Sequence, residues 1–161
     1  MALGDNTLRS AAGNSQRGRN PYMVQTTLNL ATALSDKGSA LAASDVIPVI
    51  AVPKGTMVLN AGIEVDTASD GSTFTVDLGM VDADVFVDGF DATSAAAVVA
   101  QNPAAYQPVM AVADDNIDVT IATLSGGAVT SGKFRVWAVL MDCSDMGNDG
   151  VANEVARDYL A

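Results

Sequence analysis

The chain has 161 residues, of which 49 % are hydrophobic, only 5 % are aromatic and 17 % are charged, and its net charge is −11. This length suits one compact domain with a single core. The negative charge argues against a nucleic-acid partner, because phosphate contacts need a basic face. An apolar fraction dominated by small and branched side chains is typical of many thin strands that pack as two sheets.

The sequence contains no histidine and a single cysteine, Cys143. These counts exclude an internal disulfide, a cysteine-rich zinc site and the histidine-dependent catalytic pairs of hydrolases. We therefore expect a protein that is not an enzyme and that needs no cofactor. No apolar run resembles a signal peptide or a membrane helix, so we expect no membrane contact and synthesis in the cytoplasm.

The first 20 residues show neither helical nor strand periodicity, which predicts an extended arm over residues 1–20. Asp5 is the only acid there, against Arg9, Arg17 and Arg19, so the arm is basic on an otherwise acidic chain. One interpretation is a mobile terminus. The other is an arm that binds the acidic surface of a neighbouring protein.

Alternating apolar residues from Tyr22 to Leu34 predict a long first strand. A second apolar run, Val46 to Val52, contains Pro48, which cannot donate to a ladder and therefore indicates a sheet edge or a bulge. The stretch from Gly62 to Gly79 has period two on both sides of Asp70-Gly71. That dipeptide between two alternating runs predicts a β-hairpin.

Three further strands are predicted over residues 107–112, 117–124 and 133–141, after a helical turn expected between residues 93 and 100. Both faces of the last strand are largely apolar, which predicts burial by the core on one side and an oligomer or partner interface on the other. The core side is expected to hold Phe134, Val136, Ala138 and Leu140, and the interface side Arg135, Trp137, Val139 and Met141.

Residues 143–161 are predicted to form a loop and a short C-terminal helix, because apolar residues recur there at helical spacing. The strands between residues 21 and 142 have Gly-rich turns between them and one long crossover. This pattern predicts an all-β domain over residues 21–142, an antiparallel β-sandwich whose strand count suits a jelly roll.

The sequence offers candidate residues for two kinds of binding site. The cluster of Asp82, Asp84 and Asp88 offers oxygen ligands for calcium, but Phe86 stands where a third acidic ligand belongs, so a solvated acidic rim is favoured and no metal site is predicted. Trp137 could stack on a sugar together with Tyr106, although a single Trp on a central strand is more often core or interface.

The run from residue 45 to residue 96 contains four distinctive elements: an Ile/Val-rich strand that ends in Val-Pro, a Gly-Ile-Glu-Val strand that ends in Asp-Thr-Ala, a Thr-Val-Asp-Leu-Gly strand and an Asp-Ala-Asp-x-Phe-x-Asp-Gly turn. With these elements the run resembles capsid decoration, or cement, proteins of tailed bacteriophages. The resemblance covers about a third of the chain and includes no catalytic signature.

The resemblance implies a jelly-roll virion protein, often a homotrimer, that stabilises the outer capsid surface by bridging subunits of the major capsid protein. Arg9, Arg17 and Arg19 of the arm would then pair with acidic groups on the capsid. The alternative is a receptor- or glycan-binding module of a phage fibre or surface knob.

Overall fold

The structure, a computed structural model, describes residues 20–93, 99–100 and 108–143. Residues 1–19 of the predicted arm and the whole predicted C-terminal helix lie outside this part of the chain.

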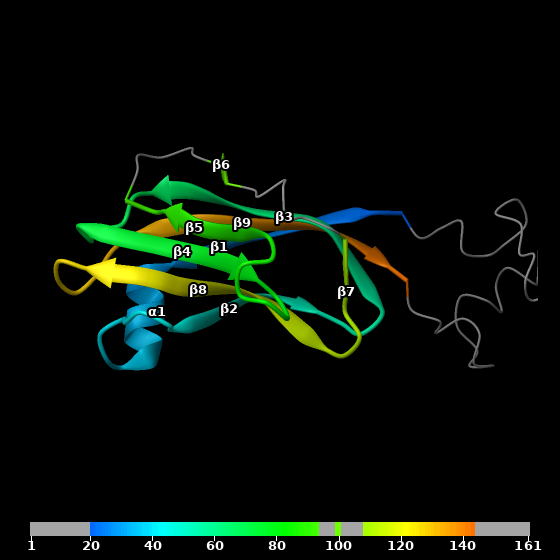
Figure 1. Ribbon diagram of the computed structural model, residues 1–161, viewed down its shortest axis with the longest axis horizontal. Helices are drawn as coiled ribbons and strands as arrows, with labels where there is room; N and C mark the ends of the chain where they lie inside the picture. Colours follow the sequence, from blue (N-terminus) through cyan, green and yellow to red (C-terminus); the bar gives the residue numbers. More distant parts are fainter. Residues whose placement is uncertain (1–19, 94–98, 101–107, 144–161) are drawn as a thin grey trace, which may run out of the picture.

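Two antiparallel sheets pack face to face (Figure 1). In sheet A the strand order is β1, β9, β3 and β6, and the short β7 also pairs with β3; in sheet B it is β2, β8, β4 and β5. The strands are β1 (Tyr22–Asn29), β2 (Val46–Val52), β3 (Thr56–Thr67), β4 (Thr73–Gly79), β5 (Val87–Asp91), β6 (Val99–Ala100), β7 (Val109–Met110), β8 (Asp115–Ser125) and β9 (Lys133–Asp142).

The strands pair from the ends of the domain inwards. The first strand pairs with the last, β2 with β8, β3 with β6 and β7, and β4 with β5. Except between β4 and β5 and between β6 and β7, the chain changes sheet from one strand to the next. This is the strand order of a jelly roll. The predicted all-β antiparallel sandwich with jelly-roll topology is therefore confirmed.

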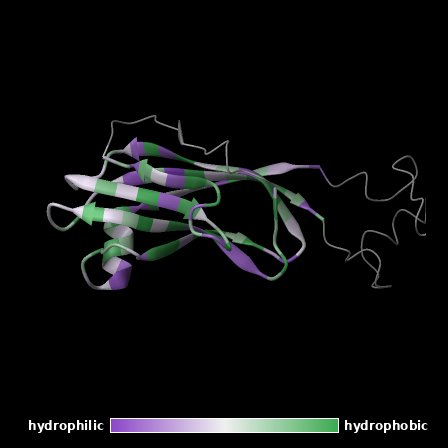
Figure 2. Ribbon diagram, viewed as in Figure 1, coloured by the Kyte–Doolittle hydropathy of each residue, from purple (hydrophilic) through white to green (hydrophobic). Residues whose placement is uncertain are grey.

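The core lies between the sheets, and each long strand contributes alternate residues to it, which gives the banded strands of Figure 2. At its centre Phe74 of β4 stacks on Phe134 of β9, with ring centroids 6.2 Å apart and planes inclined by 17°. Both side chains are fully buried. Because β4 belongs to sheet B and β9 to sheet A, this stack joins the two layers.

The hairpin predicted between Gly62 and Gly79 is wrong. The two runs are strands, but β3 lies in sheet A and β4 in sheet B, so the chain crosses the sandwich between them. The physical reason is that both edges of β3 are already taken, by β9 on one side and by β6 and β7 on the other. The apolar residues of both runs meet in the core between the sheets: Ile63, Val65, Phe74 and Val76.

Asp70, which was predicted to turn the hairpin, instead anchors this crossing. Its carboxylate accepts hydrogen bonds from the backbone N–H of Thr130 (2.9 Å), the hydroxyl of Thr130 (2.6 Å) and the backbone N–H of Ser131 (3.1 Å). These donors lower the pKa of Asp70 from 3.8 to about 2, with the Thr130 hydroxyl as the largest contribution. The β3–β4 connection is thereby held against the β8–β9 connection.

The long first strand predicted from Tyr22 to Leu34 is too long. The strand ends at Asn29, and α1 (Leu30–Lys37) follows. The Asn29 side chain accepts the backbone N–H of Ala31 at 3.0 Å, and Gly38, in the left-handed conformation (φ +69°), ends the helix. Asn29 thus caps the helix, at a position where the alternation of apolar and polar residues had predicted that the strand continues.

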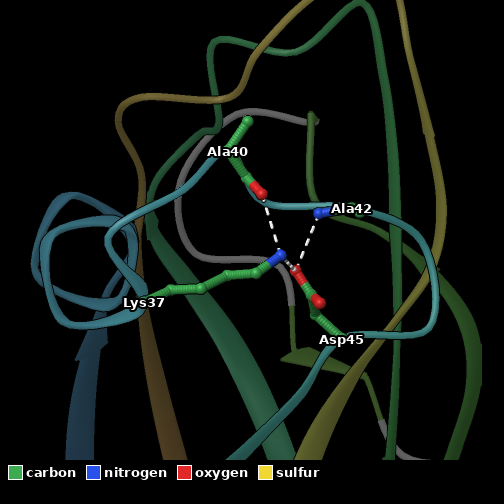
Figure 3. A network of polar contacts seen from close by, with 4 residues as sticks. All are labelled: Lys37, Ala40, Ala42 and Asp45. Carbon is green, nitrogen blue, oxygen red and sulfur yellow. Dashed lines mark hydrogen bonds and ion pairs between the residues drawn. The ribbon is translucent and has the colours of Figure 1, made fainter.

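The connection from α1 to β2 is fixed by Lys37 and Asp45 (Figure 3). The Lys37 ammonium donates to the Ala40 carbonyl (2.8 Å) and pairs with the Asp45 carboxylate, which also accepts the backbone N–H of Ala42 (2.7 Å). The hydrogen bonds from Lys37 and then Ala42 lower the pKa of Asp45. Both charged groups are partly exposed, so the pair orders the loop more than it stabilises the fold.

Of the other strands expected from the sequence, some agree closely with the structure and some differ from it. Pro48 lies in the edge strand β2, where the register shifts between Pro48 and Ile50, so both features expected of this proline are present. The strands predicted over residues 117–124 and 133–141 correspond to β8 and β9. The strand predicted over 107–112 is shorter, and β6 is a strand where the end of a helical turn was expected.

Replacing Phe134 by Ala should lower the free energy of unfolding by about 3–5 kcal/mol, because the cavity between the sheets cannot close fully. The matched control is Val112→Ala, at a side chain that is 76 % exposed. This change should alter the free energy of unfolding by less than about 0.5 kcal/mol. Urea unfolding of both variants measures the difference. Equal effects of the two changes would show that the stack does not join the sheets.

Asp70→Asn should lose stability in a pH-dependent way. A carboxyl whose folded pKa lies below its unfolded value stabilises the fold above the unfolded pKa, and this contribution is lost as the pH falls through the folded pKa. The wild-type advantage over Asp70→Asn should therefore be complete above pH 4 and disappear toward pH 2. Thermal unfolding of both proteins between pH 7 and pH 2 measures it.

Thr130→Val tests the cause of this pH dependence, because it removes the hydroxyl donor and keeps the backbone donors. Thr130→Val should therefore show part of the pH-dependent loss of stability that Asp70→Asn shows. A wild-type advantage over Asp70→Asn that stays constant over the whole pH range would contradict the assignment.

Candidate interaction surface

The last strand, β9, presents its two faces as the sequence predicted. Its core side is buried between the sheets. On the opposite side Arg135 is exposed, while Trp137, Val139 and Met141 are partly buried. These four residues therefore share the outer face of sheet A.

Neighbouring strands extend this outer face with apolar side chains that the sequence analysis did not connect. Met23 of β1 lies directly opposite Val139 and is 61 % exposed. Met57 of β3 lies between Met141 of β9 and Met110 of β7, and Met110 is 37 % exposed. Directly opposed residues share one face of a sheet, with Cβ atoms about 4.5–5.5 Å apart.

We call this apolar set the sheet A patch. It consists of Met23, Met57, Met110, Trp137, Val139 and Met141. It spans four strands; Met23 and Met110 are exposed, and the other four side chains are partly buried. Methionine side chains are flexible and adapt to irregular partner surfaces, so such a face suits contact with another protein.

The charges on this outer face balance. Arg135 pairs with Glu64 of β3 at 3.1 Å, and both side chains keep partial solvent contact. Such a pair adds little stability. Arg135, predicted as an interface residue, therefore brings no uncompensated positive charge to the face.

The outer face of sheet B is different, because it is polar and acidic. Asp77 of β4 and Asp118 of β8 face outward, and Asp91 of β5 is exposed. Burial, and then the nearby Asp115, raise the pKa of Asp118. Within the described part of the chain, every basic residue lies outside the sheet B strands: Lys37, Lys54, Lys133 and Arg135.

The acidic residues considered as metal ligands do not converge. Asp82 and Asp84 are exposed in the β4–β5 connection, and Asp88 is exposed in β5. Within the described ranges, no group of three His, Cys, Asp or Glu residues is arranged to hold a metal ion. Asp114, in the turn before β8, accepts the backbone N–H of Lys54 at 2.9 Å, which is a structural role.

Four other predicted binding residues, namely Arg9, Arg17, Arg19 and Tyr106, lie outside the described residues, so the roles expected of them stay predictions. Residues 20–93, 99–100 and 108–143 include no helix that is long and apolar enough to cross a membrane.

Both described ends of the chain leave the sandwich beside the sheet A patch. Tyr22 pairs with Leu140, so the start of β1 and the end of β9 are neighbours. They lie at the end of the molecule opposite to α1 (Figure 1). Segments that precede and follow the described domain therefore begin next to Met141.

The comparison with known proteins gives no match to a protein-family model or to a curated protein sequence. Solved structures do match. The fold is similar to a chain in the capsid asymmetric unit of cyanophage Pam1, with a TM-score of 0.60, 16 % identity, and coverage of 87 % of this chain and 97 % of that one. It is also similar to a chain in the capsid of Ralstonia phage GP4, with a TM-score of 0.54, 17 % identity, and coverage of 78 % and 86 %. At these identities the likeness shows a shared fold: this chain has the jelly roll of proteins found in phage capsid structures.

Proposed function

We propose that this protein is a non-enzymatic structural protein of a phage virion, which decorates the outer capsid surface and bridges subunits of the major capsid protein. The observation that carries the proposal is the sheet A patch, a set of apolar side chains that lies on the outer face of one sheet beside the polar Gln25 and Asn60, on a chain whose net charge is −11. An apolar face that spans several strands of a soluble domain marks a contact with another protein.

The structural neighbours support the virion location. Two phage capsid structures contain chains that share the fold over most of their own length. Fold alone does not fix function. It is the combination of this fold with a flat, partly exposed patch on one sheet that favours a structural role in the capsid.

The N-terminal arm is proposed as the part that binds the capsid. Arg9, Arg17 and Arg19 make it basic, whereas the sandwich is acidic. An arm of this charge would pair with carboxylates on the major capsid protein. Several copies, as in a homotrimer, would multiply weak arm contacts into stable binding.

The test is co-sedimentation with empty capsids of the phage that carries the gene, after removal of this protein. Deleting residues 1–20 should leave the thermal unfolding midpoint nearly unchanged and abolish binding. Replacing Arg9, Arg17 and Arg19 together by Gln should weaken capsid binding at least tenfold, and replacing them by Lys should retain most of it. Salt should weaken wild-type binding, because exposed charges are screened.

Full binding by the truncated protein would contradict the role of the arm. Binding to isolated glycans that depends on Trp137, without any binding to capsids, would favour the alternative of a receptor-binding module.

A further inference from the structure

We infer that the outer edge of β1 accepts an extended segment of the major capsid protein as an added strand, and that this segment carries no net negative charge. Among the described strands, β1 is the outermost strand of sheet A and pairs with β9 alone. The identity of the partner rests on the proposed function. The strand addition itself rests on the backbone and the side chains of β1.

The register between β1 and β9 shows which backbone groups point to this edge. The Leu30 N–H donates to the Gly132 carbonyl at 3.0 Å, and these two residues continue the register of the strands. Opposite residues of an antiparallel pair alternate between pairs that exchange hydrogen bonds and pairs that do not. The N–H and C=O groups of Met23, Gln25 and Thr27 therefore point away from β9. The described part of the chain supplies no partner for this row of donors and acceptors.

The other edges of the sandwich are protected against strand addition. In sheet B, β2 contains Pro48 and a shift of register, and the five-residue β5 carries Asp88 and Asp91. In sheet A, β6 and β7 have two residues each. Short strands, prolines, bulges and charges keep an edge from pairing with another chain. By contrast, β1 has eight residues, no proline, no charged side chain and no shift of register, so it is the edge among the described strands that is open to a partner.

The side chains of β1 indicate what the added segment contains. Tyr22, Val24 and Thr26 share the core side of β1 with the buried Leu28, but Tyr22 is 46 % exposed and the other two are only partly buried. An added strand with apolar residues at alternate positions would cover this margin of the core. Because the chain has a net charge of −11, it would repel a segment that is rich in carboxylates.

A second copy of the chain suits this edge less well than another protein does. Antiparallel pairing of β1 with β1 of another copy is two-fold symmetric, so it would build a dimer and not the trimer proposed above. It would also bring together two chains that each have a net charge of −11. A capsid protein that covers the sheet A patch is already next to the edge, because Met23 belongs both to the patch and to β1.

Hydrogen exchange of single backbone amides, measured by NMR on the full-length chain, tests the strand addition. In the free protein the amides of Met23, Gln25 and Thr27 should exchange fast, and those of Val24 and Thr26, which are bonded to β9, should exchange slowly. Overlapping synthetic peptides of the major capsid protein are then added one at a time. The peptide that contains the segment should slow the three fast amides about tenfold or more.

Gln25→Pro tests the edge by substitution. It removes an N–H that points outward and no bond to β9, and proline is tolerated in an edge strand at such a position. The variant should bind the protecting peptide and empty capsids about tenfold more weakly, because one hydrogen bond to the added strand is lost. The matched control, Gln25→Ala, keeps the N–H and should bind like wild type. Thermal unfolding of both variants checks the fold, and the exchange pattern of wild type needs no substitution.

Three results would overturn the inference. The first is slow exchange at Met23, Gln25 and Thr27 in the absence of peptide, which would show that the chain itself, or a second copy if the protection rises with concentration, already covers the edge. The second is a peptide set of which no member protects these amides, and the third is full binding by Gln25→Pro.

The same measurements separate the inference from the proposed function. Binding of wild type to capsids together with any of these three results would overturn the strand addition and leave the proposed function standing. Conversely, protection of alternate amides of β1 by a peptide, without any binding to capsids, would support the strand addition and contradict the proposed function.

Discussion

The carboxylate of Asp70 is the constraint on which the geometry of the sandwich depends. It lies in the connection from β3 to β4 and accepts three hydrogen bonds from Thr130 and Ser131, in the connection from β8 to β9. Both connections cross between the sheets, and the four strands that they join are the inner strands of the two layers. Together with the hydrogen bonds from the Asp70 backbone N–H to the Ser131 carbonyl (3.4 Å) and from the Ser72 hydroxyl to the Ser125 carbonyl (3.0 Å), the carboxylate joins the two connections at this end, and the stack of Phe74 on Phe134 fills the space between the layers.

Local sequence patterns predicted the elements of the fold better than their connections. Alternation identified β8 and β9, and Pro48 correctly indicated an edge strand with a bulge. The dipeptide Asp70-Gly71 correctly marked a turn, but a turn signal cannot tell whether the strands that flank it pair or cross the core. That choice depends on which edges other strands occupy. Asn29 was missed as a helix cap because Leu28 and Leu30 on either side of it continue the alternation.

The candidate surface was predicted in part, for a related reason. Alternation within β9 placed Trp137 and Val139 on the face away from the core, and the structure agrees. Met57 and Met110 join Met141 only through the register of three strands that are distant in the sequence. Pairing of this kind is not encoded in any local pattern. Likewise, the similarity to phage capsid chains is visible in the fold at 16–17 % identity, because a jelly-roll core tolerates many apolar exchanges.

The separation of charge between the two outer faces also affects how the molecule approaches other molecules. With Asp77, Asp91 and Asp118 on the outer side of sheet B and Glu64 compensated by Arg135 on that of sheet A, the described part of the sandwich carries its charge unevenly through its thickness. In the field of a charged particle such a body experiences a torque before any atoms touch, and it arrives in a preferred orientation. Each encounter is then more productive than random collision would allow, and this advantage decreases as ionic strength shortens the range of the field.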